Sequence, residues 1–210
     1  MTGSSTVRDP LIHDSRVDAL PIATPPGWEQ VALADLHTTM SDHAHAEKKA
    51  ALSGLSLLNA HPSRDDLVTK MAKLAREEIR HLDQVLGHMR ARGWSLLPDR
   101  SDRFAKALLA VRRGGGGVAA LCDRLLIAAL IEARSWERLN LLGAALGDAG
   151  EAELAGFYGE LARSEAGHYR VFVDLAKTEC PGEDVDARLA ELATVEAAVI
   201  ADLPHEPRIH

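Results

Sequence analysis

Aromatic residues are scarce in this chain: Phe, Trp and Tyr make up 4% of its 210 residues, although hydrophobic residues reach 46%. Strands are rich in aromatic and β-branched side chains, so this shortage, beside abundant Ala and Leu, favours helices. The sequence has no run of 18 apolar residues and therefore predicts no membrane-spanning helix. It also shows no apolar core of a secretion signal near its N-terminus. These absences predict an all-α protein of the cytoplasm.

Cysteine and net positive charge are also lacking. The two cysteines, Cys122 and Cys180, form no Cys-x-x-Cys pair, which disfavours a rubredoxin-type iron site and fits a reducing compartment. The formal charge of -7 argues against non-specific nucleic-acid binding, because phosphates need a basic face, but it permits a local basic patch. Side chains that could form such a patch, or simply decorate solvated helix faces, are Lys48, Lys49, Lys70, Lys73, Arg76, Arg80, Arg112 and Arg113.

The rest of the chain divides into an N-terminal arm and one domain. Residues 1–26 are rich in Ser, Thr, Asp and Pro and predict a loosely held arm, which leaves residues 27–210 as the domain. Ser63, followed three residues later by Asp66, predicts a capped helix start. The run Gly114–Gly117 lacks the Lys-Ser/Thr of a phosphate loop and predicts a flexible break. We expect helices near Trp28 and over residues 38–59, 63–92, 101–111, 118–146, 151–178 and 185–201.

The most informative motif is Glu-x-x-His, which occurs twice, each time after a lone upstream Glu on another predicted helix. The spacing is nearly the same in the two copies: the motif Glu follows the lone Glu by 31 residues in the first copy and by 33 in the second. Six residues at such spacings are what a four-helix bundle uses to hold two metal ions in its core. The first set is Glu47, Glu78 and His81, and the second is Glu132, Glu165 and His168.

Each of these glutamates falls within an apolar helix stripe, as Glu78 does beside Leu74 and Val85. Four buried carboxylates would repel one another, whereas two divalent cations would balance their charge and two neutral imidazoles would complete the ligand set. Mixed carboxylate and imidazole ligands suit iron or manganese better than structural zinc. A single Glu-x-x-His is usually a solvated helix face, and it is the repetition that favours a metal site.

Other polar residues have weaker signals. His43 lies one turn before Glu47 and could contact the site, face a substrate, or serve as an ordinary polar residue. Asp123, Arg134 and Arg138 could contact the metal ligands from outside or pair with other charges at the surface. Core packing is the default expectation for Trp136.

The segments around the six residues indicate which kind of di-metal protein this is. They resemble the tRNA-(2-methylthio-N6-isopentenyladenosine-37) hydroxylase family, MiaE, and the likeness runs from about Trp28 through the C-terminal tail. Glu-Lys-Lys-Ala-Ala and Ile-Glu-Ala-Arg-Ser are its more specific parts, because all ferritin-like di-iron proteins share the Glu and His pattern. The segments that carry the resemblance are residues 43–51, 74–81, 124–135 and 157–169.

This resemblance implies a ferritin-like four-helix bundle with additional short helices, and an O2-dependent monooxygenase that hydroxylates the isopentenyl group of modified adenosine 37 in tRNA. It implies two iron ions, with manganese as a possible replacement, held by the six residues named above, with Glu78 and Glu165 as the bridging carboxylates. No further catalytic residue is assigned. An external electron donor is needed, because the sequence shows no flavin or iron–sulfur motif, and a monomer or small homo-oligomer is expected.

Two other functions share the six-residue pattern. One is a di-iron oxygenase for small apolar substrates such as aldehydes or lipids, for which a long closed apolar tunnel is expected. An open mouth lined by Lys and Arg would instead favour tRNA. The other is a ferritin-like iron-storage protein, which would assemble into a cage.

Overall fold

The computed structural model describes residues 19–210, which form seven α-helices and no strand. This confirms the all-α prediction, and the helix bounds agree with the expected ranges to within a few residues. Four helices are long: α2 (Leu36–Ala60), α3 (Asp65–Ala91), α5 (Val118–Asp148) and α6 (Ala152–Glu179). Three are shorter: α1 (Trp28–Ala34), α4 (Arg103–Ala110) and α7 (Val185–Asp202).

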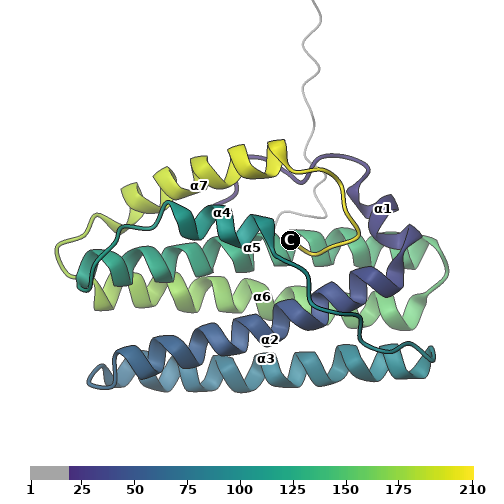
Figure 1. Ribbon diagram of the computed structural model, residues 1–210, viewed down its shortest axis with the longest axis horizontal. Coiled ribbons are helices and arrows are strands. Elements are labelled where there is room, and N and C mark those ends of the chain that lie inside the picture. Colours follow the sequence, from purple (N-terminus) through teal and green to yellow (C-terminus); the bar gives the residue numbers. More distant parts are fainter. Residues whose placement is uncertain (1–18) are drawn as a thin grey trace, which may run out of the picture.

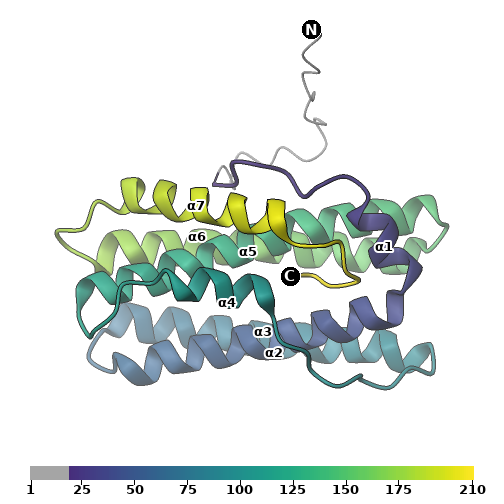
Figure 2. The same cartoon turned by 45° about the horizontal axis from the view of Figure 1, so that its top comes forward.

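The four long helices form two helical hairpins, α2–α3 and α5–α6, each with a short connection (Figure 1). Residues 61–64 join the first pair and residues 149–151 join the second, so that the helices within each pair run antiparallel. The longer segment 92–117, which contains α4, leads from one hairpin to the other. Helix α7 lies against α5, on the side away from α2 and α3 (Figures 1 and 2).

Glycine allows close approach of the helices within both hairpins. A Cβ atom on Gly54 of α2 would lie 3.4 Å from the Met71 carbonyl oxygen of α3, and one on Gly143 of α5 would lie 3.4 Å from the Ala155 carbonyl oxygen of α6. Apolar side chains from all four long helices are buried around these contacts. Among the described residues, no helix is long and apolar enough to cross a membrane.

The start of α3 differs from the expectation that Ser63 caps it. The helix begins at Asp65, and Arg64 occupies the cap position without a side-chain cap hydrogen bond. Arg64 instead donates from Nη1 to the Glu179 carbonyl oxygen, 2.8 Å away at the end of α6. Two acidic side chains in the first turn, Asp65 and Asp66, oppose the positive end of the helix dipole. The contact of Arg64 with α6 and the acidic first turn of α3 thus take the place of the expected Ser63 cap.

Part of the predicted N-terminal arm is held by the bundle. The Thr24 side chain is buried, and its Oγ1 atom donates to Glu137 Oε2 over 2.6 Å. The Ile22 carbonyl oxygen accepts from Arg134 Nη2 at 3.1 Å. Residues 1–18 of that arm lie outside the described residues. The expectation of a loose arm therefore does not hold for the segment that approaches α5.

Asp123, Arg134 and Arg138 serve in buried polar contacts that neither of the two expectations covered. Arg134 is fully buried and donates from Nε to Glu196 Oε1 at 2.7 Å, which links α5 to α7. Arg138 is also buried and donates from Nη1 to the Ile209 carbonyl oxygen at 3.0 Å. Asp123 is buried as well and accepts from two arginines near the start of α5. The prediction that these three residues pair with other charges at the surface was wrong, because other segments cover these faces of α5.

Candidate metal centre

The six predicted residues come together in the middle of the bundle. Glu47 lies on α2, Glu78 and His81 on α3, Glu132 on α5, and Glu165 and His168 on α6, and all six side chains are buried. Their ligand atoms form two groups, each with four atoms within 4.8 Å of one another. The first group is Glu47, Glu78, His81 and Glu165, and the second is Glu78, Glu132, Glu165 and His168.

Both imidazoles turn the same ring nitrogen, Nδ1, toward the carboxylates. His81 Nδ1 lies 3.2 Å from Glu78 Oε2 and 3.5 Å from Glu47 Oε2. His168 Nδ1 lies 2.8 Å from Glu78 Oε1 and 3.4 Å from Glu165 Oε2. The helical spacing of three residues therefore places each His beside the Glu of its own motif, while Glu78 also reaches across to α6.

Three atoms at this centre are buried without a hydrogen-bond partner among residues 19–210: Glu78 Oε1, Glu165 Oε1 and His168 Nδ1. The first and third are 2.8 Å apart but do not have hydrogen-bond geometry. A buried polar atom left unpaired costs about 1–3 kcal/mol, so three in one place require an explanation. Two divalent cations, bound by these atoms, supply one, because they would also balance the four carboxylates. The donor set thus fits a pair of metal ions.

The local electrostatics favour cations. Burial raises the pKa of Glu132 well above its usual range, and the negative charge of Glu165 raises it further. Burial also raises the pKa of Glu78. Burial opposes the charged form of His81, but hydrogen bonds to Glu47 and Glu78 outweigh it and raise the pKa to about 10. Positive charge is therefore strongly stabilised at this position, as expected for a cation-binding site.

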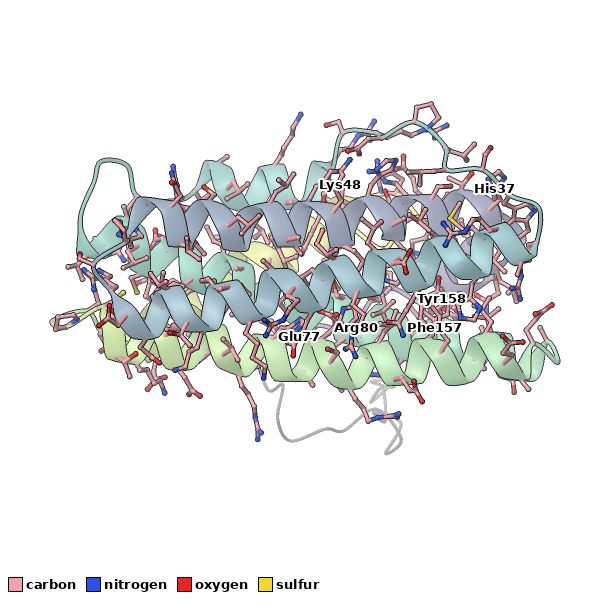
Figure 3. The ribbon with its side chains drawn as sticks, turned by 90° about the horizontal axis from the view of Figure 1, so that it is seen from below. His37, Lys48, Glu77, Arg80, Phe157 and Tyr158 are labelled. Carbon is pink, nitrogen blue, oxygen red and sulfur yellow. The ribbon has the colours of Figure 1, made fainter. Side chains whose placement is uncertain are left out.

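Glu77 is a functional candidate to which the sequence pattern assigned no role. Its Oε2 atom lies 3.2 Å from His168 Nε2, the ring nitrogen opposite the one that faces the carboxylates. Figure 3 shows Glu77 on α3 at the boundary with α6. A carboxylate in this position fixes the ring orientation and tautomer of a metal-binding histidine. The adjacent acids Glu77 and Glu78 were visible in sequence, but the partner of Glu77 is 91 residues away.

His43 both contacts the centre and faces a cavity, so two of its expected roles are combined. Its Nε2 atom lies 2.7 Å from Glu47 Oε1. Burial lowers the pKa of His43 to about 4, which makes the ring neutral at pH 7, with Nε2 as the donor to the carboxylate. The ring stacks on Tyr158 with centroids 5.4 Å apart. The Tyr158 hydroxyl is buried without a hydrogen-bond partner in the described part of the chain.

A cavity of about 870 Å³ lies beside the centre, between α2, α4 and α5. Glu47, Glu132 and Glu165 line its buried end together with His43, and Ile127, Ile131 and Phe172 contribute to its apolar walls. Its outer part, the mouth, carries basic side chains from α2, α4 and α5 and from the loops before and after α4. These are Lys49, Arg100, Lys106, Arg112 and Arg124.

His210 also lines this cavity, and no sequence pattern predicted this position for it. Its Nε2 atom lies 2.8 Å from Ser135 Oγ, one turn after Glu132 on α5. The tail is fixed by Asp42 of α2, which accepts from the Ile209 backbone N–H at 2.8 Å and from Arg208 Nε at 2.9 Å. Residues 75 positions apart therefore share one wall of the cavity.

Comparisons with known proteins agree with this geometry. The model of the family described as tRNA-(MS[2]IO[6]A)-hydroxylase (MiaE) matches residues 12–210. The tRNA 2-(methylsulfanyl)-N(6)-isopentenyladenosine(37) hydroxylase of Pseudomonas putida is 40% identical over 189 residues, which cover 89% of each chain. The hydroxylase of that name from Salmonella typhimurium is 36% identical over 157 residues, 72% of this chain and 56% of the relative.

A solved structure also matches. It is a Synechococcus protein described as having aldehyde deformylating oxygenase activity, with a TM-score of 0.83 and 33% identity over 91% of this chain and 94% of the other. This likeness confirms the predicted ferritin-like bundle with additional short helices. The family match spans nearly the whole chain, including all six residues of the centre. This chain is therefore a member of the MiaE family of tRNA hydroxylases.

Proposed function

We propose that this protein hydroxylates the isopentenyl group of 2-methylthio-N6-isopentenyladenosine at position 37 of tRNA, in the cytoplasm. The names of its two relatives support this substrate. The single structural observation that carries the proposal is a large cavity that begins at Glu47, Glu132 and Glu165 and opens between basic side chains. A substrate with an apolar end and a phosphate backbone matches both ends of this cavity.

The proposed ligands of two iron ions are the six residues of the centre, with Glu78 and Glu165 shared between them because both belong to each group of ligand atoms. Manganese is the alternative metal, because carboxylate ligands suit it. When bound, the metal pair supplies the redox chemistry that reduces O2. The overall change consumes O2, two electrons and two protons, converts one C–H bond of the substrate into C–OH, and releases water. The electrons come from an external donor protein.

The chain itself orients the substrate and excludes water. The apolar side chains Ile127, Ile131 and Phe172 surround the path to the centre and suit an isopentenyl group. Exclusion of water at the buried end strengthens every electrostatic contact there. His43, neutral and hydrogen-bonded to Glu47, holds that carboxylate in place. Glu77 holds the ring of His168 in the same way.

The decisive test uses protein loaded with Fe(II) and incubated with O2, a reductant and isopentenylated tRNA. Nucleosides from the digested tRNA are then measured by mass spectrometry. We expect the mass of one added oxygen on the hypermodified adenosine. Consumption of O2 by an iron-loaded protein without this product would exclude the tRNA substrate and leave the metal centre in place.

A second candidate is a di-iron oxygenase acting on a small apolar substrate. The Synechococcus structure favours it, because that protein is described as having aldehyde deformylating oxygenase activity. Incubation of the same iron-loaded protein with a long-chain aldehyde, followed by gas chromatography of the hydrocarbon fraction, tests it directly. The basic mouth of the cavity weighs against this candidate, since an aldehyde offers no negative charge to it.

A further inference from the structure

Two basic residues at the cavity mouth, Arg112 and Arg124, are without a carboxylate partner in the described structure. We propose that they form a phosphate-binding site for the RNA strand whose modified base enters the cavity. This proposal rests on the proposed function and goes beyond it, because it assigns residues and a chemical group to recognition of the backbone.

The first observation is that Arg112 and Arg124 line the same cavity mouth, where no carboxylate pairs with either of them among residues 19–210. Arg124 is half-buried, and burial together with the positive charge of Arg112 lowers its pKa. The one hydrogen bond found for the Arg124 side chain joins Nη2 to the uncharged Ser56 Oγ, at 3.2 Å. Two like charges at one cavity mouth, one of them partly desolvated, repel each other, and a bound anion would offset that repulsion.

The second observation is that the neighbouring acids are already engaged. Asp123, the acid next to Arg124 in sequence, is buried and accepts from Arg113 and Arg188, each with a contact of 2.7 or 2.8 Å. Arg112 is followed by Arg113, which pairs with Asp123, and then by Gly114–Gly117, which have no side chains that could supply a carboxylate. The positive charge of the pair is therefore not neutralised by the nearby chain.

The third observation concerns other acids at the mouth. Asp99 lies 2.9 Å from Lys48 Nζ and 2.7 Å from Lys49 Nζ, and Asp102 accepts from the Ala105 backbone N–H at the start of α4. The mouth thus separates into a part in which charges are paired and a part in which they are not. The unpaired part holds Arg112 and Arg124, and the side chains of Arg100 and Lys106 at the mouth also have no carboxylate partner among residues 19–210.

The position of the pair relative to the metal centre suits a nucleotide. Arg124 and Glu132 lie on the same helix, two turns apart, which is about 12 Å along the axis. The cavity runs between them, past Ile127, Ala128 and Ile131. A nucleotide whose base substituent reaches Glu132 therefore leaves its phosphate near Arg124, where guanidinium groups can bind it with paired N–H donors.

The test compares the variants Arg112→Gln and Arg124→Gln with the natural chain, using the anticodon stem-loop RNA carrying the modified adenosine. Binding is measured by fluorescence anisotropy at several salt concentrations. Each substitution should weaken binding about tenfold at low salt and reduce the slope of log affinity against log salt by about one. Arg124→Lys should recover part of the affinity, since it keeps the charge but loses the paired geometry.

The matched control is Arg170→Gln on α6, an exposed arginine that does not line the cavity. Its affinity and salt slope should equal those of the natural chain. Equal slopes for the natural chain and the three Gln variants would overturn the proposal. Tighter binding of inorganic phosphate or adenosine monophosphate than of the stem-loop, lost in Arg124→Gln, would also overturn it, because the site would then serve a free anion.

A second readout separates failure of this proposal from failure of the proposed function. Hydroxylation is measured on the stem-loop and on the free modified nucleoside, which has no phosphate. Arg124→Gln should lower turnover of the RNA about tenfold more than it lowers turnover of the nucleoside. Loss of both activities to the same extent would contradict a phosphate contact. Absence of hydroxylation by the natural chain itself would instead reject the proposed function.

Discussion

At the scale of single residues, the six side chains of the centre differ in how many metal ions each would bind, because the two groups of ligand atoms overlap. Glu132 belongs to one group, whereas Glu78 belongs to both. We therefore expect Glu132→Ala to retain one metal ion per chain and Glu78→Ala to lose both. Metal content is measured by mass spectrometry of purified protein, with far-ultraviolet circular dichroism to verify helical content. Two bound ions in either variant would contradict the ligand assignment.

The Tyr158 hydroxyl offers a second prediction at this scale. It is buried without a hydrogen-bond partner among residues 19–210, and burial raises its pKa far above the usual value. Removing an unpaired buried hydroxyl relieves its desolvation, so Tyr158→Phe should stabilise the fold by about 1 kcal/mol. Urea unfolding followed by circular dichroism measures the change. A loss of stability would mean that the hydroxyl has a partner, such as an ordered water molecule.

Residues whose spacing repeats along a helix were predictable from the sequence. Residues whose contacts lie far away in the sequence were not. Glu78 and His81 were predictable because three residues on a helix define one face. His210 was not, since its neighbour Ser135 is 75 positions away and no periodic pattern connects them. Arg134 was misjudged for a related reason: its surroundings depend on α7, and charge alone suggested a surface position.

At the scale of helices, α7 is tied to the bundle by a buried ion pair. Arg134 and Glu196 are fully buried, and two hydrogen bonds of 2.7 and 2.9 Å join them. Glu196→Ala leaves the guanidinium unpaired at that contact and should cost about 3–5 kcal/mol of unfolding free energy. Thermal unfolding measures the loss. The variant Glu196→Gln is the control, because its amide oxygen can still accept from Arg134 while Arg134 keeps its pairing with Glu137, and it should lose less stability; an equal loss would mean that the cost lies elsewhere.

Asp123 gives a pH-dependent prediction for the segment between α4 and α5. Burial opposes its charge, but hydrogen bonds from Arg188 and Arg113 outweigh burial and hold the pKa of this carboxyl well below its usual range. A lowered pKa contributes stability above the unfolded value of about 3.9, and this contribution is lost as pH falls below it. The difference in unfolding free energy between the natural chain and Asp123→Asn should therefore shrink between about pH 4 and pH 2.

This difference is measured by urea unfolding of both proteins at a series of pH values. At neutral pH we expect the natural chain to be more stable by about 3 kcal/mol. Comparing the two proteins cancels the acid sensitivity of the metal centre, which is common to both. A difference independent of pH would show that the Asp123 charge contributes nothing to the fold.

Helix positions were predicted well because proline, glycine and apolar periodicity act locally. α3, for example, ends at Ala91, just before Gly93, whose φ of 70° suits glycine. The start of the same helix was harder to place, because the tertiary contact between Arg64 and Glu179 decides it. The same limit applies to Thr24, whose buried contact with Glu137 depends on packing of the finished bundle.

At the scale of the whole molecule, charge is distributed unevenly. The net formal charge is -7, yet five basic side chains lie around one cavity. These basic residues outnumber the two acids at the mouth, Asp99 and Asp102, and this local positive charge makes an acidic chain compatible with an RNA substrate. Of the eight basic residues that the sequence offered for such a patch, Lys49 and Arg112 lie at the mouth.

The oligomeric state distinguishes the proposed tRNA hydroxylase from an iron-storage protein. A storage protein of this fold forms a closed shell of many chains, whereas a tRNA enzyme must leave its cavity accessible. We expect gel filtration with light scattering to give a mass of one or two chains of 22.6 kDa each. A large assembly would favour storage and contradict the open mouth.

The division of the proposed ligands between two hairpins bears on the order of events during synthesis. The α2–α3 hairpin carries Glu47, Glu78 and His81, and the α5–α6 hairpin carries the other three. Each hairpin is held by local contacts, which form early, whereas docking of the two depends on distant ones. A nascent chain with only its first hairpin made therefore has half a ligand set and cannot assemble the metal pair. The oxidising metal pair can therefore form only after the second hairpin has been synthesised and has docked onto the first.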